Sequence, residues 1–578
     1  MYRQTALGLT LAMLVQPALA QDTTIQPEET TALTEQQAVT AQNYMVAAAN
    51  PLAVQAGYDV LAAGGSAADA AVAVQMMLNL VEPQSSGIGG GAFLVFWDAS
   101  QGRLTTLDGR EKAPMAATPD YWLGQDGEPV GFWDAVIGGR SVGVPGTLAL
   151  LDRLHAQHGR TPWADLMQPA ITTAEDGFAI SPRMADSIAG AMDRSLDLFP
   201  ETAAYFFHED GTPRAAGETL TNPAFARTLR LIAAEGIAPF YTGAIAGDIV
   251  AAVRTDTNPG IMTMQDLAEY EVIERNPVCV LYRTHEVCGM GPPSSGALTV
   301  GQMLGVLDNF DLSTMSEADA WHHYIEAARL SYADRGKYMA DSDFVSMPTE
   351  GLIDPDYLSS RADLIDPTTT MGQAQAGTPA WDETRLWSPD VNFDRPGTSH
   401  MVIVDSYGDM VSMTTTIETG FGSRVMTGGF LLNNEMTDFS FRPEGADGPV
   451  ANRVEAGKRP RSSMAPTIVL TDGQPSVLIG SPGGSRIINY VAGSLVRMID
   501  MGMDPQSAIN AGHIVNRNGA TDLEEGTEAE NMAEALAGFD QETTVRNLNS
   551  GLHVITIAPD GTLTGAADPR REGAVMGD

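Results

Sequence analysis

The sequence contains very little lysine. Only Lys112, Lys337 and Lys458 occur in 578 residues, and the lysines and arginines together number 33 against 73 aspartates and glutamates, which gives a formal net charge of −40. A chain this acidic is repelled by phosphate backbones and anionic lipid surfaces, which disfavours nucleic acid and membrane surfaces as partners. We expect an acidic surface on which arginine supplies nearly all of the positive charge.

Cysteine and metal-ligand patterns are also scarce, with two cysteines and nine histidines in the whole chain. The histidines are scattered without the spacing of metal ligands, so the sequence predicts no metal site and no bound cofactor. Cys279 and Cys288 bracket a short alternating segment that is typical of a β-hairpin. A disulfide and two reduced, buried thiols both remain open, because spacing alone does not fix the geometry.

Long apolar runs are missing after the first 20 residues, so no later stretch predicts a membrane span. Residues 1–20 combine Arg3, an apolar core over 7–15 and a small-residue cleavage site at 18–20, the pattern of a cleaved signal peptide. Residues 21–44 are predicted to be a mobile polar tail. We therefore expect an exported protein, periplasmic or secreted.

The most informative position is a glycine–threonine junction. Gly397 and Thr398 follow a long polar stretch over 366–397 and precede a buried, alternating strand. Cleavage between them would give Thr398 a free α-amine with a pKa of about 7.7–8.0, which can serve as a general base for its own hydroxyl. The chain would then consist of a large subunit, 45–397, and a small subunit, 398–578.

The rest of the chain alternates helices and strands. Helical patterns begin at Asn50 and at Ser66, and residues 140–360 are mostly helical. Strands are expected over 92–97, 104–107, 401–404 and 410–417, with a last pair over 553–557 and 563–565. Arg110 directly follows a strand and suits a carboxylate ligand, although spacing alone favours a surface salt bridge. Gly483 and Gly484 open a helix, and their N–H groups suit an oxyanion.

Several motifs occur together in one order, and together they resemble the γ-glutamyltransferase family of N-terminal-nucleophile hydrolases. The motifs are Glu82-Pro-x-Ser-Ser-Gly-x-Gly-Gly-Gly91, Arg110-Glu-x-Ala-Pro114, Pro292-Pro-Ser-Ser-Gly296, Glu326-Ala-x-Arg-Leu-x-Tyr-Ala-Asp-Arg335, Thr398-x-His400, Leu431-Leu-Asn-Asn434, Arg459-Pro-x-Ser-Ser-Met464, Gly480-Ser-Pro-Gly-Gly-Ser-Arg486 and Asp568-Pro-Arg570. The resemblance covers residues 45–578. It implies an α+β fold, a four-layer αββα sandwich, built from two chains that stay associated as a heterodimer after self-cleavage.

The resemblance also assigns roles to individual residues. Thr398 is implied as the nucleophile, Thr416 as its hydrogen-bonding neighbour, and Gly483 with Gly484 as the oxyanion hole. The donor's α-carboxylate would be bound by Arg110, Ser462 and Ser463. Its α-ammonium would be bound by Glu435 and Asp438.

Two features depart from the family pattern. Glu418 stands where many members have asparagine, and it either contacts the donor ammonium or points away toward an arginine such as Arg424. In the second case it is structural, and we favour that interpretation slightly. We expect Arg110 at the carboxylate end of the site, away from the three carboxylates. The 441–457 loop is short and lacks the tyrosine of lidded members, so we expect a more open pocket.

These observations favour an exported enzyme that cleaves γ-glutamyl amides such as glutathione and passes the acyl group to water, an amino acid or a peptide. An amide acylase for glutaryl or cephalosporin side chains uses the same chemistry. A non-catalytic, exported solute-binding protein would fit the acidity and the glycine-rich loops, but it would have no use for a cleavable Gly397–Thr398 junction. Donor specificity, the balance of hydrolysis and transfer, and the oligomeric state remain open.

Overall fold

The protein folds around two large antiparallel sheets. A computed structural model describes residues 34, 36–381, 387–390, 395 and 397–578. The predicted signal peptide lies outside the described residues. The predicted tail was too long, because Val39–Ala41 (β1) already pairs with Leu563–Ala567 (β22) and Met45–Ala48 (β2) follows closely.

The first sheet has seven strands in the order β23-β2-β10-β11-β3-β4-β7. Its further members are β10 (Thr398–Val404), β11 (Met410–Thr416), β3 (Gly91–Asp98), β4 (Arg103–Gly109), β7 (Ile273–Arg275) and β23 (Ala574–Gly577). Segments from both sides of Gly397 alternate in this sheet, since β10 lies between β2 and β11 and β11 pairs with β3. β23 was not anticipated; it pairs with β2 and ends the sheet.

The second sheet also has seven strands, in the order β1-β22-β21-β17-β16-β9-β8. Its remaining bounds are β21 (His553–Ile557), β17 (Gln474–Gly480), β16 (Thr467–Thr471), β9 (His285–Gly289) and β8 (Val278–Tyr282). The two sheets pack face to face through buried apolar side chains that include Val402, Ile468, Leu478 and Ile555. β8 and β9 form the expected hairpin, in which Cys279 lies opposite Cys288 and a disulfide joins them with an S–S distance of 2.07 Å.

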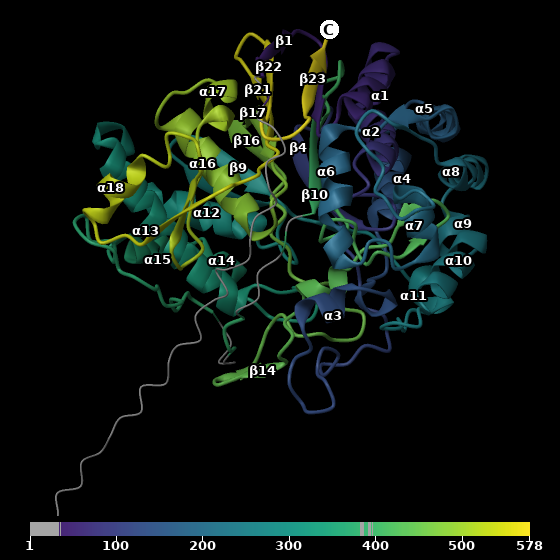
Figure 1. Ribbon diagram of the computed structural model, residues 1–578. Helices are drawn as coiled ribbons and strands as arrows, with labels where there is room; N and C mark the ends of the chain where they lie inside the picture. Colours follow the sequence, from purple (N-terminus) through teal and green to yellow (C-terminus); the bar gives the residue numbers. More distant parts are fainter. Residues whose placement is uncertain (1–33, 35, 382–386, 391–394, 396) are drawn as a thin grey trace, which may run out of the picture.

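One helical layer covers the outer face of the first sheet (Figure 1). Asn50 caps α1 (Pro51–Ala62), and Ser66 and Asp69 form a capping box on α2 (Ala67–Val81), whose residues are all buried. The layer continues with α4 (Thr147–His158), α5 (Trp163–Asp176), α6 (Pro182–Gly190), α7 (Pro200–Phe206), α8 (Pro223–Glu235), α9 (Ala238–Tyr241), α10 (Ala244–Ala252) and α11 (Met264–Ala268), whereas α3 (Phe132–Val136) lies apart from it in a separate apolar cluster (Figure 1).

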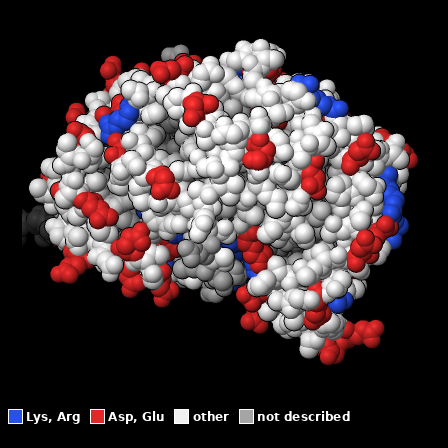
Figure 2. All heavy atoms as spheres, turned by 90° about the horizontal axis from the view of Figure 1, so that it is seen from above, with Lys and Arg blue, Asp and Glu red and all other residues white. Residues whose placement is uncertain are grey.

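A second helical layer packs on the other sheet and completes an αββα sandwich, which confirms the predicted fold class (Figure 1). Its members are α12 (Gly296–Leu307), α13 (Glu317–Tyr338), α14 (Thr349–Leu352), α15 (Pro355–Ala362), α16 (Ile487–Ile499), α17 (Pro505–Asn510) and α18 (Met532–Ala537). Among the described residues, no helix is both long and apolar enough to cross a bilayer. Acidic side chains outnumber basic ones on the face shown in Figure 2, as the composition predicts.

Candidate active site

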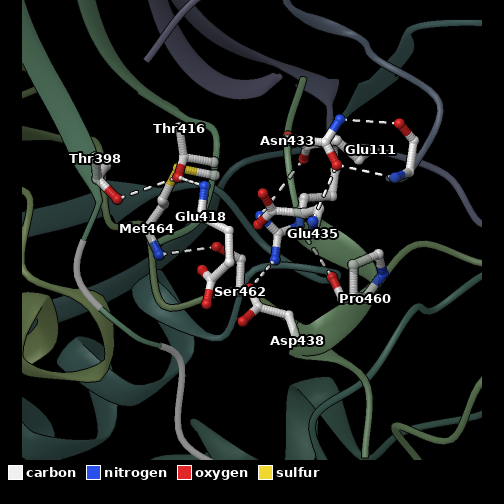
Figure 3. A network of polar contacts seen from close by, with 12 residues as sticks. Glu111, Thr398, Thr416, Glu418, Asn433, Glu435, Asp438, Pro460, Ser462 and Met464 are labelled. Carbon is white, nitrogen blue, oxygen red and sulfur yellow. Dashed lines mark hydrogen bonds and ion pairs between the residues drawn. The ribbon is translucent and has the colours of Figure 1, made fainter. Parts of the chain in front are cut away.

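Thr398 and Thr416 lie directly opposite each other where the β10–β11 hairpin reaches the edge of the pocket. The Thr398 hydroxyl donates to Thr416 Oγ1 over 3.3 Å, and Thr416 in turn donates to the carbonyl oxygen of Gly397 over 2.9 Å (Figure 3). The Glu418 N–H donates to the same Thr416 oxygen over 2.8 Å. Thr416 therefore links the predicted nucleophile with the carbonyl group that precedes it.

Gly483 and Gly484 lie between β17 and α16, in a loop that only glycine accommodates easily. Their φ angles are +134° and +58°, in the region that side chains disfavour. Gly484 lines the same pocket as Thr398, whereas Gly483 packs against the ring of Tyr490. The helix begins after a 3-10 turn, Gly484–Arg486, rather than directly at the glycines.

Arg110 is buried in the centre of the site, so the surface salt-bridge interpretation is wrong. Its side chain is 1% exposed and forms ion pairs with Glu435 and, over 2.5 Å, with Asp438. It also donates to the carbonyl oxygens of Pro460 (3.2 Å) and Arg461 (3.0 Å). Burial disfavours the charge of Arg110, but the neighbouring carboxylates outweigh burial and raise its pKa.

Three carboxylates meet beside Arg110. Glu418, Glu435 and Asp438 each place an oxygen within 4.8 Å of the others, an arrangement that suits a bound cation (Figure 3). The expectation that Arg110 is separated from the carboxylates is therefore wrong. The arginine that contacts Glu418 is Arg395, through its N–H, and not Arg424, whose guanidinium donates to Gly422 and Thr419.

Glu111 was part of a motif but had no predicted role. It is fully buried, and its Oε2 lies 3.6 Å from Arg110 Nη1. Burial raises the pKa of Glu111 to about 7, against the effect of Arg110. Burial, with a contribution from Glu111, likewise raises the pKa of Glu435. The site thus holds more acidic groups than Arg110 can neutralise, which favours uptake of a proton or of another cation.

Ser462 and Ser463 line the pocket, as the sequence predicted. The Ser462 N–H donates to Pro293, and Ser295 donates to the Ser462 carbonyl oxygen over 2.6 Å. Arg335 donates to Ser463 Oγ over 2.6 Å. Residues of two other motifs, Pro292–Gly296 before α12 and Glu326–Arg335 on α13, therefore hold Ser462 and Ser463 in position through hydrogen bonds.

Most of the residues that line the pocket belong to the predicted site. Lining residues that sequence reasoning missed are Arg395, Met464 and Ile487. Arg395 had no distinguishing pattern, because it belongs to the polar stretch before the junction; its N–H donates to Glu418 Oε1 over 3.3 Å. The lining residues come from segments other than the 441–457 loop.

The αββα architecture, with a threonine hydroxyl at the start of a central strand, is that of an N-terminal-nucleophile hydrolase. The sequence model of the gamma-glutamyltranspeptidase family matches residues 53–578, and the chain belongs to this family of enzymes. The chain is 36% identical over 547 residues to the glutathione hydrolase proenzyme of Bacillus subtilis (strain 168), covering 92% of this chain and 91% of that protein.

Acylases are similar as well. The Acylase ACY 1 proenzyme of Pseudomonas sp. (strain V22) is 34% identical over 553 residues, covering 93% of this chain and 94% of that protein. The crystal structure of cephalosporin acylase from Bacillus halodurans superposes with a TM-score of 0.82 at 28% identity, covering 94% and 97% of the two chains. The fold and the enzyme class are therefore shared across hydrolases of different acyl groups.

Proposed function

We propose that this chain is an exported, self-processing γ-glutamyltransferase and hydrolase that acts on γ-glutamyl amides such as glutathione. The observation that carries the proposal is the Thr398 hydroxyl, hydrogen-bonded to Thr416, at the edge of a pocket that holds Arg110 among carboxylates. The polar and charged lining suits a zwitterionic acyl group, with both an ammonium and a carboxylate, better than an apolar one.

Self-cleavage would come first. Thr398 attacks the carbonyl carbon of Gly397, and the hydrogen bond from Thr416 to the Gly397 oxygen supports that attack by stabilising the developing negative charge. Hydrolysis of the resulting ester frees the α-amine of Thr398. The two fragments would stay together as a heterodimer, because strands from both alternate in the first sheet.

Turnover would reuse the same hydroxyl. The α-amine of Thr398 takes the hydroxyl proton, the oxygen attacks the γ-carbonyl of the donor, and the amine then protonates the leaving amine. The Gly483 and Gly484 N–H groups would stabilise the tetrahedral oxyanion. Water, or the amine of an amino acid or peptide, resolves the threonyl γ-glutamyl ester by the reverse sequence of proton transfers.

Separate groups of residues would bind the positive and the negative group of the donor. Glu418, Glu435 and Asp438 would hold the α-ammonium, whereas Arg110 with Ser462 and Ser463 would hold the α-carboxylate. The ammonium would share Glu435 and Asp438 with Arg110, which already pairs with both.

A glutaryl or cephalosporin acylase is the second candidate, favoured by the similarity to cephalosporin acylase. One experiment separates the proposals. Purified protein is analysed by gel and N-terminal sequencing, then assayed on matched γ-glutamyl and glutaryl anilides, with Thr398→Ala as control. We expect two fragments, the smaller beginning Thr398-Ser399-His400, and a preference for γ-glutamyl donors. A single active chain would refute self-processing, and a glutaryl preference would favour the acylase.

A further inference from the structure

Two arginines lie on one tryptophan ring next to the donor pocket. Trp133 belongs to α3, and Arg194 ends a short 3-10 helix, Met192–Arg194. The Cζ atoms of Arg194 and Arg424 are 5.0 Å and 5.6 Å from the centre of the indole ring. Arg424 also donates from Nε to the carbonyl oxygen of Arg194 over 3.3 Å. Three segments that are distant in sequence thus bring two like charges to one indole ring.

Arg424 is buried, and none of the described carboxylates pairs with it. Its side chain is 1% exposed, and its guanidinium donates only to neutral oxygens, those of Gly422, Thr419 and the Arg194 carbonyl. Within the part of the chain that the structure describes, neither Arg424 nor Arg194 forms an ion pair with a carboxylate. Burial, with a contribution from Arg194, lowers the pKa of Arg424 to about 9.

Several other buried arginines are neutralised, although Arg497, which lies on the ring of Trp321 and donates to Gly512, also has no carboxylate partner among the described residues. Arg110, Arg486 and Arg570 each form an ion pair with a buried carboxylate. A buried charge without a counter-ion is costly, and 73 acidic residues were available to supply one. Arg424 differs from Arg497 because a second, exposed arginine, Arg194, shares its tryptophan ring, and this pair of like charges points to an anion that comes from outside the chain.

The arginine pair adjoins the donor pocket on its Glu418 side. Glu418 lines the pocket, and Arg424 donates to the side chain of the next residue, Thr419. Arg395, another lining residue, has its Cζ 3.8 Å from the ring centre of Phe132 and 5.9 Å from that of Trp133. A substrate that extends past Glu418 would therefore reach the arginine pair.

We propose that Trp133, Arg194 and Arg424 form a subsite for a second carboxylate of the substrate, distinct from the carboxylate on the glutamyl α-carbon. The inference rests on the proposed function, since it presumes a donor in the pocket. Guanidinium groups bind carboxylates through paired N–H donors, and the indole face orients them. The carboxylate comes either from the amine partner, such as a peptide C-terminus, or from an acyl group extended by a further acidic residue.

A binding measurement tests the subsite without turnover. The thermal unfolding midpoint of the purified enzyme is followed with increasing N-acetylglycine or N-acetylglycinamide at constant ionic strength. We expect a saturable rise with the carboxylate and none with the amide. Arg194→Gln and Trp133→Leu should abolish the rise, whereas Arg103→Gln, which also removes an exposed charge, at the start of β4, should keep it. Equal shifts for both probes, or an unchanged rise in Arg194→Gln, overturn the proposal.

Turnover then identifies the source of the carboxylate. One arm compares γ-glutamyl-alanine with γ-glutamyl-alaninamide, and the other compares a γ-glutamyl anilide with the same anilide extended by a second γ-glutamyl group. In one arm the acidic donor should have a KM about tenfold lower, as expected for one charged contact, and Arg194→Gln should remove this advantage with kcat within twofold. Equal KM values in both arms overturn the subsite. Absence of any hydrolysis refutes the proposed function instead, and the binding measurement still decides the subsite.

Discussion

The backbone of Gly397 lies directly against the carbonyl group of Glu418. A Cβ atom built on Gly397 would be 1.8 Å from that oxygen and 2.6 Å from the carbonyl carbon of Thr419. The loop cannot easily retreat, because Glu418, Phe421 and Arg424 have φ angles of +77°, +66° and +68°. Only glycine therefore fits before Thr398 without displacing a loop that lines the site.

Gly397→Ala should slow self-cleavage at least tenfold, because the added methyl group would shift the carbonyl that Thr398 attacks. The appearance of the small fragment on gels, timed from purification, measures the effect. Gly420→Ala is the matched control in the same loop, since a Cβ built on Gly420 would lie 4.0 Å from its nearest neighbour, the carbonyl oxygen of Gln84. Normal cleavage of Gly397→Ala would show that the contact with Glu418 does not constrain the reaction.

Thr416→Val should impair both cleavage and turnover, since it keeps the shape and removes the hydroxyl that joins Thr398 to the Gly397 carbonyl. We expect losses of roughly 10²–10³ in each rate, the range for one lost charge-stabilising donor. Thr415→Val is the control, because Thr415 Oγ1 is buried without a hydrogen-bond partner in the described structure.

Thr398→Ala should abolish both reactions, and Thr398→Ser should retain part of each.

Local patterns predicted many of the helices and strands, and the family resemblance implied the αββα fold, but neither could predict partners that are distant in sequence. Alternation predicted the strands that became β10 and β11, whereas the family resemblance implied that Thr416 is the neighbour of Thr398, and the two lie opposite each other in the hairpin. β23 pairs with β2, more than 500 residues away, and is only four residues long, so no local signal revealed it. The burial of Arg110 depends on Glu435 and Asp438 and was missed for the same reason.

Arg110→Lys should raise KM for γ-glutamyl donors about tenfold while kcat changes only a few-fold, because lysine keeps the charge but loses the planar fork. The unfolding midpoint should also fall by several degrees, since the contacts to Pro460 and Arg461 are lost. Arg275→Lys is the control: its ion pair with Asp108 lies outside the pocket lining, so stability alone should change. Unchanged kinetics in Arg110→Lys would remove Arg110 from donor binding.

Glu418→Gln tests whether the Glu418 carboxylate binds the ammonium group of the donor. Removing one of three clustered charges should raise KM for a γ-glutamyl anilide roughly five- to tenfold, whereas a glutaryl anilide, which lacks the amine, should bind equally or better. The ratio of kcat/KM for the two donors is the measurement, and Glu444→Gln, at an exposed position of the 441–457 loop, is the control. If stability falls and the ratio holds, Glu418 is structural, as we first favoured.

Glu111 should make stability depend on pH in the direction opposite to an ordinary ion-paired carboxylate. Its folded pKa of about 7 exceeds the usual 4.5, so the folded state binds the proton more tightly. This contribution is fully present below pH 4.5 and is lost as the pH rises through 7, a difference of about 3 kcal/mol at most. Glu111→Gln imitates the protonated form, so it should match the wild type at pH 5 and exceed it in unfolding midpoint at pH 8.

Thermal unfolding at several values between pH 5 and 8 measures this difference, with Glu534→Gln on α18 as an exposed control that keeps the wild-type profile. Arg110 and Glu435 face Glu111 and titrate with it, so the midpoint of the pH profile belongs to the group rather than to one residue. The direction in which stability changes with pH still distinguishes Glu111 from an ordinary ion-paired carboxylate. A Glu111→Gln protein that loses stability between pH 5 and 8 as steeply as the wild type would assign the pH dependence to carboxylates elsewhere.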